Sequence, residues 1–162
     1  MSQNKYSNRK PVIAVIGASS CGKELSDLAY ETGRVIAEAG CILLNGGGKG
    51  VMEASARGAK EAGGLTVGII PAEDKKWSNP FIDIVIATGM GQARNTVIAG
   101  SADGVIAVGG AYGTLSEVAF TLKHGKPIAG ISSWERVLPE VTSFDHPQEA
   151  VDFILKKIGQ NG

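Results

Sequence analysis

The sequence is short of net charge, of cysteine and of long apolar runs, and each shortage excludes a class of protein. Sixteen basic residues balance sixteen acidic ones, whereas nucleic-acid and membrane-surface binders need a basic patch; we expect neither partner. Two cysteines, Cys21 and Cys41, give no metal spacing and no disulfide framework. No apolar run approaches the about 20 residues of a membrane span. We recognise no signal peptide and expect a cytoplasmic protein.

Glycine is the residue that the chain has in excess, with 23 among 162 residues, which is about twice the usual share. A chain of this length is sufficient for one hydrophobic core. We therefore expect a single domain over residues 11–162, preceded by a disordered polar tail over residues 1–10.

Apolar runs that predict buried strands alternate along the chain with amphipathic segments that predict helices. The expected strands cover residues 12–16, 41–44, 65–70, 82–87, 105–108 and 127–131, with a short edge strand at 141–143. The expected helices cover residues 23–39, 51–62, 92–101, 115–124 and 147–158, with one further helical turn at 134–138. This alternation predicts a doubly wound α/β fold of the Rossmann-like kind, with a mostly parallel sheet and helices on both faces.

Three turns of glycine and other small residues follow expected strands, at residues 17–20, 45–50 and 109–113. In such a fold the carboxyl ends of parallel strands share one edge, where ligands bind. Glycine lets backbone N–H groups approach an anion, and a following helix start adds unpaired donors. The three turns therefore predict a phosphate site, against the plainer alternative that these glycines only permit close packing.

Thr114 and Glu117 fit a second pattern, because a Thr followed three residues later by Glu is typical of a capping box. This pattern predicts that the fourth helix begins directly after Thr114. For Glu117, a role at the helix start alone and an added role at the site are both open.

The glycine turns do not match two common nucleotide-binding motifs. A P-loop is absent, and residues 46–50 do not space as Gly-x-Gly-x-x-Gly. No acidic residue ends the second strand, where a dinucleotide ribose would be bound, so we expect no NAD. The His, Cys and Asp residues have no metal-ligand spacing, so we expect no structural metal. His124 fits a helix C-terminus, and His146 fits a solvated helix start.

The stretch from Gly109 to Glu117, Gly-Gly-Ala-Tyr-Gly-Thr-Leu-Ser-Glu, resembles the signature Pro-Gly-Gly-x-Gly-Thr-x-x-Glu of the LOG proteins. Residues 46–52, Gly-Gly-Gly-Lys-Gly-Val-Met, resemble their other signature, Gly-Gly-Gly-x-x-Gly-Leu-Met, but are one residue short. The resemblance to this LOG/SLOG superfamily covers residues 11–131. LOG proteins are phosphoribohydrolases that release the base from nucleoside 5′-monophosphates. Nothing in the sequence supports their older label, lysine decarboxylase, and we expect no pyridoxal phosphate.

The departures from the LOG pattern change what the resemblance implies. Gly109 stands in place of a Pro, Ala111 in place of a Gly, and Asn95 in place of the Lys of an Arg-Lys pair. The form Gly-Gly-x-Tyr-Gly-Thr-Leu-Ser-Glu is more similar to the molybdenum cofactor carrier proteins, which oligomerise and bind a phosphorylated pterin without cleaving it. This implies a binding or carrier protein for a small phosphorylated heterocycle, with the molybdenum cofactor (molybdopterin) as leading ligand. The alternative is a nucleoside 5′-monophosphate phosphoribohydrolase, and a ligand sensor without turnover is not distinguished from a carrier.

The turns and the resemblance together define the candidate site residues. In an enzyme, Arg94 would position the nucleotide, and Glu117 would stabilise the oxocarbenium charge or activate water. A solvated charge is the plainer reading of Arg94. The expected phosphate and ligand contacts are Gly17, Ser19, Ser20, Asn45, Gly46, Gly47, Gly48, Arg94, Asn95, Gly109, Gly110, Tyr112, Gly113 and Thr114.

Two aromatic residues and two helices complete the expectations. Tyr112 either stacks on a planar heterocycle or fills the core, and Trp77, in the polar loop 72–80, covers the site, contacts another subunit or anchors its own loop. The third and fourth helices carry more apolar residues than one sheet face needs. This predicts a homo-oligomer, a dimer or tetramer, formed through Ile98, Ala99, Val118, Phe120 and Leu122.

Overall fold

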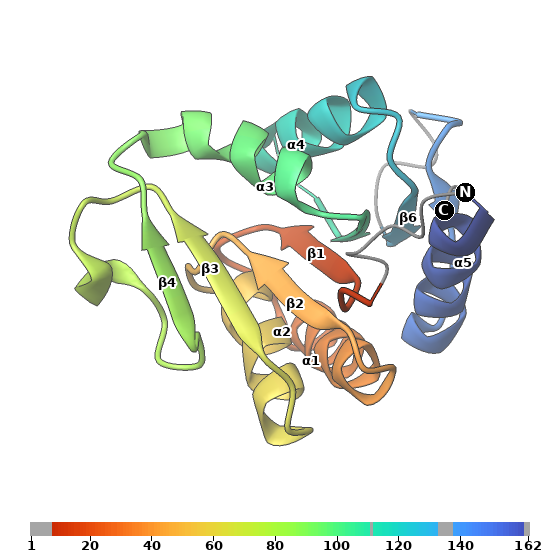
Figure 1. Ribbon diagram of the computed structural model, residues 1–162, viewed down its shortest axis with the longest axis horizontal. Coiled ribbons are helices and arrows are strands. Elements are labelled where there is room, and N and C mark those ends of the chain that lie inside the picture. Colours follow the sequence, from red (N-terminus) through yellow and green to blue (C-terminus); the bar gives the residue numbers. More distant parts are fainter. Residues whose placement is uncertain (1–7, 111, 133–137, 161–162) are drawn as a thin grey trace.

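A computed structural model describes residues 8–110, 112–132 and 138–160, and within these ranges seven strands form one sheet (Figure 1). The strands are β1 (Val12–Gly17), β2 (Ile42–Asn45), β3 (Thr66–Ile70), β4 (Ile84–Ala87), β5 (Gly104–Val108), β6 (Ile128–Ile131) and β7 (Thr142–Ser143). They lie in the order β4-β3-β2-β1-β5-β6-β7, and each neighbouring pair is parallel. The predicted parallel α/β fold is therefore confirmed.

Helices cover both faces of the sheet (Figure 1). They are α1 (Lys23–Glu38), α2 (Val51–Glu61), α3 (Asn95–Ser101), α4 (Tyr112–Lys123) and α5 (Pro147–Gln160), with short 3-10 helices η1 (Lys75–Trp77) and η2 (Gly91–Arg94). Successive side chains of a strand point to opposite faces. In β1, Ile13 and Val15 therefore join the core under α1, α2 and α5, whereas Ala14 and Ile16 join the core under α3 and α4.

The strand order creates a switch point beside β1. The chain builds β1 to β4 outward in one direction, then returns to place β5 on the other side of β1. The connections that leave β1 and β5 consequently diverge at the carboxyl edge, which is where open α/β sheets bind ligands.

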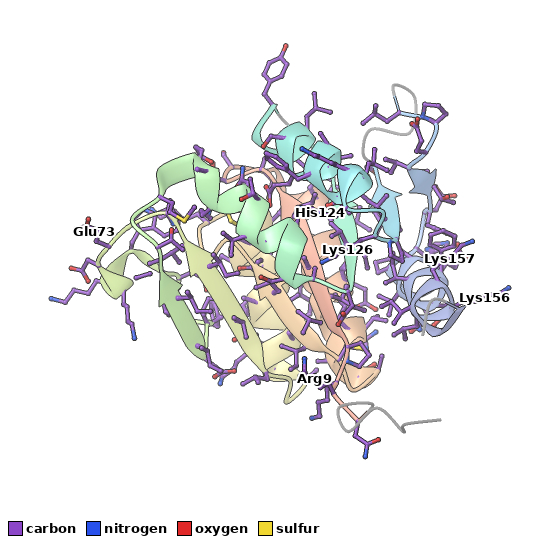
Figure 2. All side chains as sticks on the ribbon, turned by 45° about the horizontal axis from the view of Figure 1, so that its top comes forward. Arg9, Glu73, His124, Lys126, Lys156 and Lys157 are labelled. Atoms are coloured by element: carbon purple, nitrogen blue, oxygen red, sulfur yellow. The ribbon has the colours of Figure 1, made fainter. Side chains whose placement is uncertain are left out.

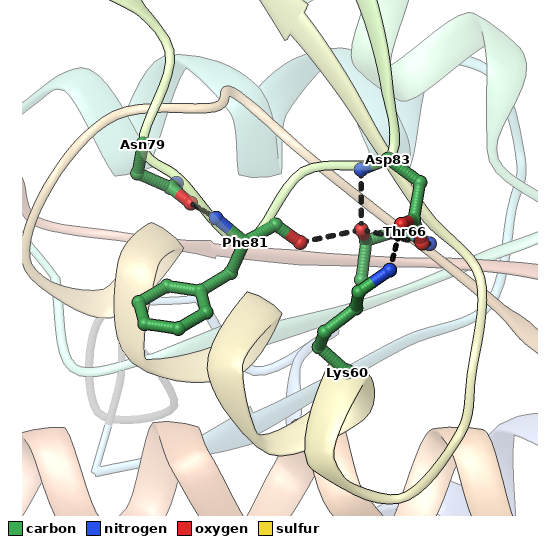
Figure 3. Close-up of polar contacts among 5 residues, drawn as sticks. All are labelled: Lys60, Thr66, Asn79, Phe81 and Asp83. Atoms are coloured by element: carbon green, nitrogen blue, oxygen red, sulfur yellow. Dashed lines mark hydrogen bonds and ion pairs between the residues drawn. The ribbon is translucent and has the colours of Figure 1, made fainter.

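Several polar contacts fix elements at the opposite, amino edge of the sheet. Asp83, just before β4, accepts a hydrogen bond from the backbone N–H of Thr66 at 3.1 Å and pairs with Lys60 of α2 (Figure 3). Lys126, just after α4, donates to the carbonyls of Ala99 and Gly100 at 3.0 and 2.5 Å and so ties α4 to the end of α3 (Figure 2). No helix among the described residues combines the length and the apolar character that crossing a membrane requires.

Two expectations about the helices are wrong. Helix α4 begins at Tyr112, so Thr114 lies inside the first turn and is not the N-cap of a capping box. Its side chain is buried, with 2% of its surface exposed. The third helix is also not uniform, since 3-10 turns of η2 precede α3.

Three of the apolar residues that suggested a helix-mediated interface already have partners in the chain. Ile98, Ala99 and Val118 are buried, with Ile98 and Val118 in the core between α3, α4 and the sheet. Their apolar character therefore requires no second subunit. The expected tail falls largely on residues 1–7, and the expected helical turn at 134–138 largely on residues 133–137, both outside the described residues.

Candidate functional site

A pocket of about 690 Å³ lies at the carboxyl edge of the sheet, beside the switch point. This volume is within the range of about 300–1,000 Å³ that is typical of small-molecule sites. The turns at 17–20, 45–50 and 109–113 follow β1, β2 and β5, which are adjacent strands. The pocket is lined by Val15, Ile16, Gly17, Ala18, Ser19, Ser20, Gly46, Met52, Pro71, Trp77, Gln92, Arg94, Asn95, Gly113, Thr114, Ser116 and Glu117.

Arg94, the last residue of η2, brings a buried positive charge to this pocket, since only 5% of its surface is exposed. Its guanidinium donates to the side-chain oxygen of Asn95 and, at 3.5 Å, to the carbonyl of Gly46. Its Nε atom is buried and has no hydrogen-bond partner within the described part of the chain. Burial lowers the pKa of Arg94 and the charge of Glu117 opposes this, but a guanidinium stays cationic in proteins. The pocket therefore contains a cation with unused donor capacity.

Glu117, on α4, is the acidic counterpart of Arg94 in the pocket lining. Burial raises its pKa to about 7, although the positive charge of Arg94 acts in the opposite direction. A carboxyl group with such a pKa exists in both protonation states near neutral pH. It can therefore accept or release a proton at the pH at which most proteins work.

Asn95 links this pair to the beginning of α4. Its side-chain amide donates to the hydroxyl of Ser116 at 3.2 Å, and that hydroxyl donates to the carbonyl of Gly113 at 2.8 Å. The first N–H groups of a helix have no partner within the helix and attract anions. Arg94 and the first turn of α4 are thus held together around the same space, which is suited to a phosphate.

The structure brings nine of the candidate residues together in the pocket lining: Gly17, Ser19, Ser20, Gly46, Arg94, Asn95, Gly113, Thr114 and Glu117. Six others lie outside that lining: Asn45, Gly47, Gly48, Gly109, Gly110 and Tyr112. Tyr112 is 88% exposed and therefore fills no part of the core.

Buried contacts account for several residues outside the lining. The side chain of Asn45 donates to the carbonyl of Met52 at 2.8 Å and accepts from the N–H of Gly47 at 2.8 Å, which holds the glycine turn against α2. A Cβ atom on Gly109 would lie 2.8 Å from Leu25 of α1. These residues shape the turns through packing.

Eight further residues line the pocket without having been expected as phosphate contacts: Val15, Ile16, Ala18, Met52, Pro71, Trp77, Gln92 and Ser116. Trp77 and Gln92 reach the pocket because η1 and η2, which carry them, flank β4 and pass the carboxyl edge. Trp77 was the most visible of them in the sequence, as the single aromatic residue of a polar loop.

The parallel sheet, the switch point and the pocket with its buried cation define a Rossmann-like protein with a small-molecule pocket at the carboxyl edge. The chain belongs to the SLOG cluster4 family, whose model matches residues 10–157. The resemblance to the LOG/SLOG superfamily is thereby confirmed.

Individual relatives point to two kinds of protein. The molybdenum cofactor binding protein of Rippkaea orientalis superposes with a TM-score of 0.87 at 37% identity, over 93% of this chain and 98% of that one. The cytokinin riboside 5′-monophosphate phosphoribohydrolase of Mycobacterium tuberculosis is 33% identical over 76% of this chain and 71% of its own length. An uncharacterized protein of Archaeoglobus fulgidus is 50% identical over 88% of this chain and 93% of its own. The similarity thus includes both a cofactor-binding protein and an enzyme.

Proposed function

We propose that this protein binds a small phosphorylated heterocycle in the carboxyl-edge pocket and carries or stores it, with the molybdenum cofactor as leading ligand. The observation that carries the proposal is the buried Arg94 with its unpartnered Nε, which lines the pocket together with Gly113 of α4. A phosphate at this position would receive hydrogen bonds from a cation and from a helix start. The 37% identical Rippkaea orientalis protein, a molybdenum cofactor binding protein, supports the choice of ligand.

The residues of the pocket fit a ligand with one anionic end and one flat end. A Cβ atom on Gly46 would lie 2.8 Å from Nη2 of Arg94, so glycine is what permits the turn to approach the cation. Apolar side chains, including Met52 and Trp77, also line the pocket. The volume of about 690 Å³ is sufficient for a pterin or purine with its phosphate.

The second candidate function is hydrolysis of the N-glycosidic bond of a nucleoside 5′-monophosphate. It is favoured by Glu117, whose pKa of about 7 suits a proton-transfer group, and by the 33% identical phosphoribohydrolase of Mycobacterium tuberculosis. Water would add to the sugar carbon as the bond to the base breaks, giving free base and ribose 5-phosphate. Arg94 would hold the phosphate, and Glu117 would stabilise the oxocarbenium charge or activate the water. Asn95 and Gly109, which replace the Lys and Pro of the LOG pattern, favour the carrier.

Co-purification tests the carrier function. The protein is purified from a host that makes the molybdenum cofactor, oxidised, and examined for pterin fluorescence. We expect a signal from the unmodified protein and its loss in Arg94→Ala. Lys49→Ala is the matched control, because it removes an exposed cation from the glycine turn outside the pocket lining. Equal signals from Arg94→Ala and the unmodified protein would contradict the proposed phosphate contact.

Incubation with AMP tests the enzyme function, with chromatographic detection of free adenine. Adenine release that Glu117→Gln abolishes would establish hydrolysis and displace the carrier proposal. If the protein co-purifies with a pterin but releases no adenine from AMP, the result would support binding without turnover.

We also propose a homo-oligomer, a dimer or tetramer, formed through α3 and α4, in which the half-buried Phe120 and Leu122 supply the contact, since Ile98, Ala99 and Val118 are already buried. Sedimentation velocity tests it. The expectations of a cytoplasmic location and of no nucleic-acid or membrane partner remain predictions.

A further inference from the structure

We infer that Trp77, together with Met52, forms the wall on which the flat ring of the ligand stacks. The inference deepens the proposed function and rests on it. Trp77 is the aromatic residue of the pocket lining, whereas Tyr112 lies outside that lining and is 88% exposed. Indole rings stack well on purine and pterin rings because both offer large π faces.

The position of Trp77 depends on the glycine turn after β2. A Cβ atom on Gly48 would lie 3.0 Å from Cη2 of Trp77 and 2.7 Å from Cε of Met52. The indole and the thioether therefore both approach this turn closely where it lacks a side chain. Trp77 remains 46% exposed, so part of its ring is available to a ligand.

The loop that carries Trp77 is held as a fixed wall and not as a swinging lid. Asn79, which is 8% exposed, donates its backbone N–H to the carbonyl of Gly47 and its side-chain amide to the carbonyl of Gly48, both at 2.8 Å. Its side-chain oxygen accepts from the N–H of Phe81 at 3.0 Å (Figure 3). Opening this loop would break buried hydrogen bonds to the turn itself.

Met52 connects the wall to the proposed phosphate position. A Cβ atom on Gly46 would lie 2.9 Å from Sδ of Met52 and 2.8 Å from Nη2 of Arg94. Met52 therefore lies beside Gly46, which Arg94 also approaches, and beside Gly48, which Trp77 also approaches. A ligand with its phosphate at Arg94 would extend its ring over Met52 toward Trp77.

A polar group accompanies the apolar wall. Gln92 and Pro71 also line the pocket, and the N–H of Gly91 donates to the carbonyl of Pro71 at 3.1 Å, which holds η2 against the end of β3. The Gln92 amide offers both donors and an acceptor to a ring edge. An apolar wall with a polar edge suits a nitrogen heterocycle better than a sugar phosphate alone.

The test uses Trp77 as its own reporter. The chain has two tryptophans, so Trp134→Phe leaves Trp77 as the single one. We expect AMP or a pterin monophosphate to quench its fluorescence. Calorimetry in the otherwise unmodified protein should show about tenfold weaker binding of the same probe to Trp77→Ala, near-normal binding to Trp77→Phe, and no change for Tyr112→Ala. Ribose 5-phosphate, which lacks the ring, should bind Trp77→Ala and the unmodified protein equally.

The outcomes separate this inference from the proposed function. Equal affinity of the ring-bearing probe for the unmodified protein and for a folded Trp77→Ala would overturn the stacking wall and leave phosphate binding intact. If Trp77→Ala weakened the binding of ribose 5-phosphate as much as that of the ring-bearing probe, the stacking wall would also be overturned, because the effect would then not depend on the ring. Failure of all three probes to bind the unmodified protein would overturn the proposed function and the inference with it.

Discussion

Gly46 is the residue at which the glycine turn meets the charged part of the pocket. Its backbone does not have positive φ, so an alanine there would not be strained by backbone conformation. The added methyl would instead meet Nη2 of Arg94 at 2.8 Å and Sδ of Met52 at 2.9 Å. Both are ends of flexible side chains, so the fold can yield while the pocket changes.

We expect Gly46→Ala to weaken phosphate-ligand binding about tenfold and to lower the free energy of unfolding by about 1 kcal/mol, at the small end of overpacking costs. Calorimetry with AMP and urea denaturation measure the two effects. Gly100→Ala in α3 is the control, since its Cβ atom would meet nothing within 4 Å. If Gly46→Ala bound AMP as tightly as Gly100→Ala, the turn would not shape the anionic end.

For single residues, the sequence predicted the charged groups of the site but could not distinguish glycines that line the pocket from glycines that only permit close packing. The motif resemblance singled out Arg94 and Glu117, and the structure lines one pocket with both. It could not distinguish Gly46, which lines the pocket, from Gly47, whose Cβ atom would lie 2.5 Å from Ile70 of β3. That difference depends on neighbours that are distant in sequence.

At the scale of elements, α1 and α2 are packed backbone to backbone. A Cβ atom on Gly33 would lie 1.9 Å from the carbonyl oxygen of Ser55, and one on Gly58 would lie 1.9 Å from that of Tyr30. Backbone atoms cannot move aside as side-chain ends do. The same helix pair supports the pocket, because the N–H of Val51 at the start of α2 donates to the carbonyl of Ala18 at 3.0 Å.

We expect Gly33→Ala or Gly58→Ala to destabilise the protein by about 2–3 kcal/mol, because either substitution must separate the two helices. Urea denaturation measures the loss. Gly159→Ala in α5, where a Cβ atom would meet nothing within 4 Å, should cost nothing or add a few tenths of a kcal/mol, because alanine favours helix. Similar stabilities for Gly33→Ala and Gly159→Ala would show that the helices tolerate separation.

The hydrophobic periodicity of the sequence predicted which segments form strands and helices better than it predicted where each helix begins. The strands and helices begin within about two residues of the expected positions, except where local signals conflict with packing. Thr114 has the sequence of an N-cap, but α4 starts at Tyr112 and buries it. A short-range motif could not show this, since burial of Thr114 depends on how α4 lies against the rest of the fold.

For the whole molecule, the decisive feature is the order of the strands. Alternation of strands and helices predicts a parallel sheet but does not specify which strands are neighbours. The order β2-β1-β5 places the turns that follow these strands side by side. It thereby encloses the two ionisable side chains of the described pocket lining, Arg94 and Glu117.

Enclosing Glu117 makes stability depend on pH. Its pKa is about 7 in the folded chain against an ordinary 4.5, so the folded state holds this proton more tightly than the unfolded state. The contribution of Glu117 to the free energy of unfolding is therefore complete below pH 4.5, and it is lost as the pH rises toward 7. We expect the unmodified protein to lose about 2 kcal/mol more than Glu117→Gln between pH 5 and pH 8, after allowance for partial exposure. Binding of an anion should weaken over the same range, because the ionised carboxylate repels it.

Urea denaturation at the two pH values, with Glu24→Gln as an exposed control, measures the difference. The binding of AMP is titrated at the same two pH values in the unmodified protein and in Glu117→Gln. This comparison is needed because a phosphate itself gains negative charge near pH 6 and therefore binds Arg94 more tightly as the pH rises. Subtracting the Glu117→Gln profile removes that contribution and leaves the carboxyl group of Glu117. Identical pH profiles for the unmodified protein and Glu117→Gln would mean that this carboxyl group is solvated. Glu117 would then lack the proton affinity that the hydrolase alternative requires, whereas the phosphate contact through Arg94 would be unaffected.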